Sequence, residues 1–252
     1  MSTTEKAAEE YRLQITQCTQ AMALAQNESV ERFLKGPAAA EGLKLFTDGN
    51  LDKRYLKLLD HFEEMAEEFD GFDELVERFV RCVPLAAYDT GSSDSQRFLD
   101  WLCGTRRLNE SQRDHVTCQR SRYAIELAAE CHRLAHVRFQ EILSTCESLS
   151  PQLDIDSPVW IHLNPIHAWG VFRTRTLLDD ESELPATVLF YPVAGTIHTA
   201  VLDPFAEFIV RELEARGPAR FGDLSPAPLE TTRSELLKLC RDLADVGIVA
   251  FG

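Results

Sequence analysis

The pattern of hydrophobic positions divides the chain into a first part with helical periodicity and a second part that begins with strands. Up to about residue 147, apolar residues recur three or four positions apart, as in amphipathic helices. From about residue 157, apolar and polar residues alternate, which is typical of half-buried strands. The segment 148–158 between them is rich in serine and proline. We therefore expect a helical domain over 1–150, a linker, and a second domain over 158–252.

The first part predicts five helices, over residues 11–33, 51–68, about 71–83, 95–102 and 111–144. Pro84 ends the third, because proline cannot continue a helix. The longest should turn an apolar stripe toward the core, made of Tyr123, Leu127, Cys131, Leu134 and Phe139.

The second part predicts strands over 159–163 and 168–177, and then a hairpin of 187–191 and 196–201. Asp203 and Pro204 are a helix cap and a first helical residue, so a helix follows the hairpin at once. A short element over 221–224 comes next. A capping box from Thr232 to Glu235 opens the last helix, which leads to an extended tail over 248–251. Strands followed by three helices predict an α+β chain whose C-terminal domain is winged-helix-like.

Composition and charge limit the classes of partner and the cellular location that we expect. The net charge of −15 disfavours nucleic acid as a partner. A DNA-reading last helix would be basic, whereas this one balances Arg233, Lys238 and Arg241 against Glu235, Asp242 and Asp245. No apolar run is long enough for a membrane span, and the polar start of the chain does not resemble a secretory signal. Seven scattered cysteines suggest reduced thiols, so we expect a cytoplasmic protein.

Two tracts resemble known proteins. The tract 187–209, TVLFYPVAGTIHTAVLDPFAEFI, with LADVGIV at 243–249, resembles the PqqD-like peptide-recognition module of peptide-modifying pathways. The tract 69–84, FDGFDELVERFVRCVP, with Tyr88 and Phe98-Leu99, is similar to the helical domain of the HvfC/BufC family. The chain departs from that family at 67–70, where Phe-Pro is usual, and at 88–91, where Tyr-Gly is usual. It therefore looks like a divergent member that resembles TglI-type proteins, which act on the terminal cysteine of a carrier peptide.

The resemblance implies a non-catalytic partner subunit. Members of this family, with the related MbnC and TglI proteins, assist multinuclear non-haem iron TIM-barrel oxygenases that oxidatively modify a cysteine in a ribosomally made precursor peptide. This chain would hold the peptide and carry no cofactor, and the iron would lie in the partner enzyme. The peptide would add to the strand over 196–201 and lie beside the last helix, which implies these binding residues: Thr196, Ile197, His198, Thr199, Ala200, Val201, Arg233, Leu237 and Arg241.

Two other functions stay open from sequence. A winged-helix transcription regulator fits the order of elements. A metalloenzyme would use His132 and His136, which share a helix face four residues apart, although no third ligand is evident. No Gly-rich phosphate loop and no Gly-x-Ser-x-Gly elbow is present, so nucleotide use and serine hydrolysis are unsupported.

Overall fold

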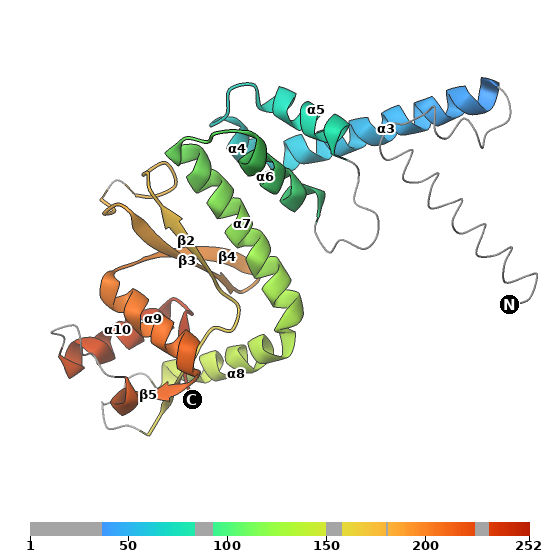
Figure 1. Ribbon diagram of the computed structural model, residues 1–252. Coiled ribbons are helices and arrows are strands. Elements are labelled where there is room, and N and C mark those ends of the chain that lie inside the picture. Colours follow the sequence, from blue (N-terminus) through green and yellow to red (C-terminus); the bar gives the residue numbers. More distant parts are fainter. Residues whose placement is uncertain (1–36, 84–92, 150–157, 180, 225–231) are drawn as a thin grey trace, which may run out of the picture. The chain divides into compact units, whose positions relative to one another are not determined.

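The computed structural model describes residues 37–83, 93–149, 158–179, 181–224 and 232–252 (Figure 1), with the backbone alone at 37–47 and 147–149. The helix expected over 11–33 and most of the loop after Tyr88 lie outside the described residues. No helix in the described ranges is long and apolar enough to cross a membrane.

The described part of the chain forms eight α-helices, one short 3-10 helix and two three-stranded sheets, which confirms the α+β class. The helices are α3 (Pro37–His61), α4 (Glu63–Ala66), α5 (Phe72–Cys82), α6 (Asp94–Thr105), α7 (Glu110–Cys131), α8 (Arg133–Leu149), α9 (Pro204–Arg216) and α10 (Arg233–Asp245), with the 3-10 helix η2 (Phe221–Asp223). The strands are β1 (Trp160–Leu163), β2 (Ala168–Phe172), β3 (Ala186–Val193), β4 (Thr196–Leu202), β5 (Ala219–Arg220) and β6 (Val249–Phe251).

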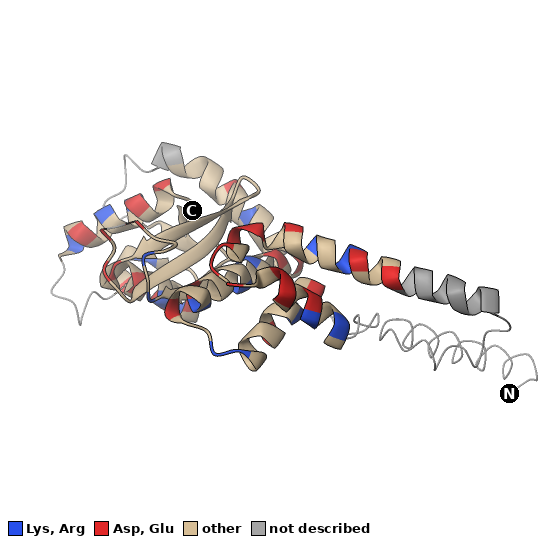
Figure 2. Cartoon of the chain, turned by 90° about the horizontal axis from the view of Figure 1, so that it is seen from above, with Lys and Arg blue, Asp and Glu red and all other residues tan. Residues whose placement is uncertain are grey.

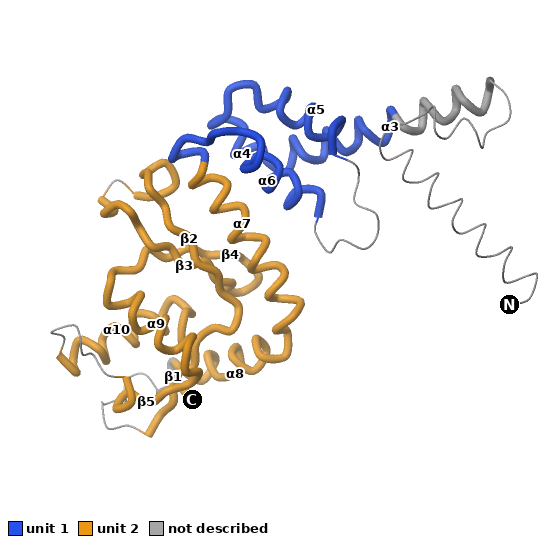
Figure 3. Tube along the Cα trace, viewed as in Figure 1, with its two compact units in different colours: residues 1–112 blue, residues 113–252 orange. Residues whose placement is uncertain are grey.

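The chain divides into two compact units, residues 1–112 and 113–252 (Figure 3). This division differs from the domain boundary expected near residue 150. The reason is packing, because the side chains of α7 and α8 belong to the core of the second unit. Ile125 of α7 packs with Val188 and Phe190 of β3, and Phe139 and Cys146 of α8 join the cluster around the other face of that strand.

The first unit is held by a cluster of aromatic rings around Phe98. Its ring lies 5.3 Å from those of Phe62 and Phe79 and 5.8 Å from that of Phe72, centroid to centroid. Arg54 is also buried there, and its guanidinium donates to both carboxylate oxygens of Asp94. These contacts join α3, α5 and α6, as the apolar stripes of the sequence predict.

Two predicted helices are broken in the structure. The stretch 51–68 belongs to α3 and α4, which are separated at Phe62. The stretch 111–144 is α7 and α8, separated at His132. Leu127 and Leu134 are 56% and 80% exposed, and Cys131 is exposed, so their expected inward position is wrong. The break lets α7 bury Ile125 in one cluster and α8 bury Phe139 in another, so one continuous stripe is not needed.

The strands form two sheets rather than a single winged-helix sheet, so that specific arrangement is not confirmed. In one sheet β1 lies between β5 and β6, and in the other β3 lies between β2 and β4, with every pair antiparallel. The tail expected over 248–251 is therefore the strand β6. Asn164, 1% exposed, joins the two sheets, because its side-chain amide donates to the carbonyls of Pro192 and Gly247, both at 3.3 Å.

The central strand β3 of the sheet β2–β3–β4 is covered on both faces. Along β3, Val188 and Phe190 enter the cluster beneath α7, whereas Leu189 and Tyr191 enter the larger cluster with α8, α9 and α10. This two-residue alternation is the pattern expected for a strand buried on both sides. Because both faces are occupied, the edges of the sheet are the places where its backbone can meet another chain.

Candidate peptide-binding edge

The register of the β3–β4 hairpin fixes which backbone groups of β4 face outward. Ala194 and Gly195 form a two-residue turn with φ of 50° and 84°, so Val193 and Thr196 close it as a hydrogen-bonded pair. Hydrogen-bonded and non-bonded pairs alternate in an antiparallel ladder. Pro192, which has no N–H to donate, lies opposite Ile197 in the next, non-bonded pair.

The same alternation continues along β4. His198 and Ala200 pair with β3, whereas the N–H and C=O groups of Ile197, Thr199 and Val201 point away from it. In the described part of the chain, β4 pairs only with β3, and no hydrogen bond between described residues reaches these outward groups. The structure thus gives β4 an open row of donors and acceptors.

The side chains of β4 alternate between the two faces, as expected from sequence. Ile197, Thr199 and Val201 lie on the α7 face, where Ile197 packs against the cluster around Phe190 and Val201 is 48% exposed. His198 lies on the other face, with its ring 6.1 Å from that of Tyr191. Burial raises the pKa of the Tyr191 hydroxyl, so the tyrosine is neutral beside the strand.

The edge strand β4 contains no charged residue. The sequence of β4, TIHTAVL, contains no Lys, Arg, Asp or Glu and no proline. In Figure 2 the acidic and basic residues colour mainly helices and loops, while the strands are largely tan. Natural edge strands usually carry a lysine, a proline or a bulge that prevents pairing with another chain. An edge without these devices is suited to accept a strand.

The opposite edge of the sheet is partly closed by α7. Asp114, 2% exposed, accepts from the backbone N–H groups of Arg173 (2.9 Å) and Thr174 (2.7 Å) and from the Thr174 hydroxyl. Ser121 donates its hydroxyl to the carbonyl of Trp169 at 3.4 Å. These contacts end β2 at Phe172, so the strand predicted over 168–177 is shorter than expected.

The expected binding residues on α10 lie on a different element from the β4 edge. α10 packs chiefly on β6, whereas α9 is the helix that contacts β4. Arg233 is exposed, Arg241 is half-buried, and Leu237 is partly buried against the main core, which is the position of a core-edge residue. The six β4 residues lie together on one strand, and the three α10 residues come from another element, although Leu237 packs against the same core cluster as Ala200 of β4.

Sequence reasoning missed one residue with a structural role at the sheet, Asp114. Asp203, in contrast, acts as the expected helix cap: it accepts from the N–H groups of Phe205 and Ala206 and so starts α9 directly at the end of β4. Asp114, at the start of α7, carried no local signal, because its partners lie about 60 residues away. Only the placement of α7 beside β2 makes Asp114 recognisable.

The histidines considered for a metal site have ordinary helix surroundings. His136 stacks on Phe139 with ring centroids 6.5 Å apart, and its Nε2 lies 2.9 Å from Nε2 of Gln140. His132 is exposed. Among the residues that the structure describes, no group of three or more His, Cys, Asp or Glu side chains could hold a metal ion.

Comparison of the chain with protein-family models, curated proteins and solved structures finds no match. The family resemblance therefore depends on the sequence tracts quoted above.

Proposed function

We propose that this chain is a peptide-recognition subunit that binds an extended precursor peptide along the open edge of β4. It presents this guest to a multinuclear non-haem iron TIM-barrel oxygenase, which oxidises a cysteine of the peptide. The identity of the partner enzyme and its chemistry rests on the family resemblance. The peptide binding rests on β4, whose outward backbone groups have no partner in the described part of the chain.

Strand addition explains how such an edge would recognise a guest. The N–H and C=O groups of Ile197, Thr199 and Val201 provide main-chain hydrogen bonds that do not depend on the sequence of the guest. Exposed apolar area at Val201 offers side-chain contact as well. Each immobilised guest side chain costs roughly 0.5–1.5 kcal/mol, so side-chain anchors must add to the backbone bonds.

The central experiment separates the backbone of Thr199 from its side chain. Thr199→Pro removes an outward N–H, and Thr199→Val keeps it while replacing the hydroxyl. The wild type and the two variants are each co-expressed with a TIM-barrel iron protein and a short precursor encoded beside it. Binding of the precursor peptide to each of the three proteins is measured by fluorescence anisotropy. We expect Thr199→Pro to weaken binding by about tenfold, the value of roughly one hydrogen bond, and Thr199→Val to bind nearly as wild type.

Two readouts complete the test. The tagged chain should co-purify with the iron protein, and mass spectrometry should find the modified cysteine only when both proteins are present. Equal affinity of Thr199→Pro and Thr199→Val would remove β4 from the binding site. A chain that never associates with the iron protein would contradict the role as its partner, whatever β4 binds.

A further inference from the structure

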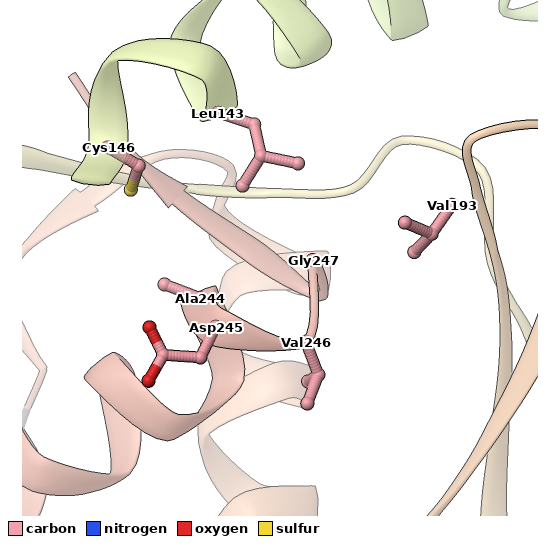
Figure 4. A pocket seen from close by; sticks show the side chains of 7 residues that line it. All are labelled: Leu143, Cys146, Val193, Ala244, Asp245, Val246 and Gly247. Atoms are coloured by element: carbon pink, nitrogen blue, oxygen red, sulfur yellow. The ribbon is translucent and has the colours of Figure 1, made fainter.

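The hairpin that carries the β4 edge also borders a pocket. The pocket has a volume of about 250 Å³ and is lined by the end of α8, the C-terminal end of α10 and Val193 at the end of β3 (Figure 4). None of its lining residues belongs to β4. The outward backbone groups of Ile197, Thr199 and Val201 thus form a continuous row beside it, and such a row is complementary to another strand.

The spacing of these outward groups is symmetric about Thr199. If a second copy of β4 lies antiparallel to the first with Thr199 opposite Thr199, then Ile197 of each copy lies opposite Val201 of the other. All of these pairs are of the hydrogen-bonded kind, because both members point their N–H and C=O groups toward the other strand. Moving the centre by one residue in either direction places an outward residue opposite the hairpin turn or the cap of α9.

The side chains in this register suit each other. A two-fold axis perpendicular to the sheet leaves Ile197, Thr199 and Val201 of both copies on the same face. Cross-strand threonine pairs stabilise antiparallel strands. The pair of Ile197 with Val201 removes apolar surface from water, because Val201 is 48% exposed in the single chain.

Charge also makes β4 a place where two copies can meet. Two chains that each carry a net charge of −15 repel each other on average, so their contact requires an uncharged surface. The sequence of β4 contains no charged residue, and the pairing therefore sets no like charges opposite each other. Asp203, the first charged residue after the strand, would lie opposite Gly195 of the second copy.

We infer that two copies of this chain associate about a two-fold axis at Thr199, where their antiparallel β4 strands join two three-stranded sheets into one. This association uses the open edge alone and requires neither a precursor peptide nor an iron enzyme. It stops at two copies, because the outer edges of the joined sheet are the β2 edges, which Asp114 and Ser121 partly close. The contact is smaller than a standard interface, so the dimer is weak and reversible.

Cysteine cross-linking of the full chain tests the register. Cα atoms of a hydrogen-bonded antiparallel pair lie about 5.5 Å apart, within the span of a disulfide. Thr199→Cys with oxidised glutathione should therefore give a linked dimer, with the bond between the two substituted positions by mass spectrometry. The matched control is Thr196→Cys, an exposed threonine of the same strand whose two copies would lie about 20 Å apart and should stay unlinked. Wild type measures the background from the exposed Cys82, Cys103 and Cys131.

Sedimentation equilibrium measures the association without oxidation. Thr199→Pro removes both N–H groups at the axis and should raise the dimer Kd about 30-fold, whereas Thr199→Val keeps them and should associate nearly as wild type. Hydrogen exchange should find the outward β4 amides unprotected in dilute protein and protected as the concentration rises through the Kd.

The outcomes separate this association from peptide binding. A wild type that stays monomeric at millimolar concentration, dimers that survive Thr199→Pro, or equal linking through Thr196→Cys would each overturn the dimer and leave the binding of the precursor peptide to its own measurement. Assemblies that grow beyond two copies would overturn it as well. A dimer that forms as expected and is not dissociated by excess precursor peptide would confirm the association and contradict peptide binding at β4.

Discussion

The two edges of the sheet β2–β3–β4 are treated in opposite ways. At β2, side chains of α7 bind some of the outward backbone groups, with Asp114 at the N–H groups of Arg173 and Thr174 and Ser121 at the carbonyl of Trp169, while no hydrogen bond between described residues reaches the outward groups of Val171. At β4, the outward groups of alternate residues have no such partner in the described part of the chain. At either edge, backbone groups that stay unpaired are a template for another strand.

The difference indicates where the molecule can bind a strand. One edge is closed at Arg173 and Thr174 by hydrogen bonds to the buried Asp114 carboxylate, which are costly to break. The other has an uncharged sequence without proline, the composition that favours pairing with an extended chain. If the proposed function is correct, α7 favours binding at β4 by narrowing the alternative edge.

The largest expected effect comes from opening the closed edge. Asp114→Ala should lower the free energy of unfolding of the second unit by about 3 kcal/mol, because buried donors lose a charged acceptor. Denaturant titration followed by near-UV circular dichroism measures it. Hydrogen exchange should also show newly exposed amides at Arg173 and Thr174. Asp242→Ala, at an exposed position, should change stability by less than about 0.5 kcal/mol, and an equal loss in both variants would contradict the role of Asp114.

The next effect compares neighbouring residues on β4. His198→Pro removes an N–H that pairs with β3, so we expect a loss of about 2 kcal/mol in unfolding free energy. Thr199→Pro removes an outward N–H and should cost less than about 1 kcal/mol. Thermal unfolding of the two variants checks the difference. Equal destabilisation would mean that the assigned register, and with it the set of outward groups, is incorrect.

Hydrogen exchange in the unmodified protein sharpens the same comparison without any mutation. The amides of Ile197, Thr199 and Val201 should exchange quickly, because they point to solvent, while those of His198 and Ala200 should be protected by β3. The protected amides at the β2 edge should include Arg173 and Thr174. Strong protection of the outward β4 amides would show that the chain covers this edge itself, and strand addition would then have no place to occur.

Local signals predicted most elements of the second unit and few of its long-range pairings. Alternation located β3 and β4, the Asp203-Pro204 pair located the start of α9, and the Thr232–Glu235 capping box is formed as expected. These features depend on residues a few positions apart. The pairing of β1 with β6 joins Leu163 to Val249, and no periodicity encodes which distant strand a given strand will meet.

The candidate edge strand was predictable because its signals are local, whereas the positions of the helices near it were not. The hairpin expected over 187–191 and 196–201 is present, but its turn, expected over 192–195, consists of Ala194 and Gly195 alone because β3 continues to Val193. The helix stripe through Leu127 and Leu134 was misassigned because helical spacing shows that residues share a face and does not show which face is buried. Placing Arg233 and Leu237 in a groove beside β4 needed tertiary contacts that spacing along one helix does not contain.

The smallest predicted effect tests the weaker contact at the closed edge. Ser121, 5% exposed, donates to the carbonyl of Trp169, so Ser121→Ala should lower the unfolding free energy by about 1 kcal/mol. Ser144→Ala is the matched control, since among the described residues that hydroxyl bonds only to Glu141 of its own helix, and its loss should matter less than about 0.5 kcal/mol. If Ser121→Ala is as mild as its control, α7 closes the β2 edge through Asp114 alone. The rest of β2 would then offer a second edge for a guest strand, and the contrast between the edges would be confined to residues 173–174.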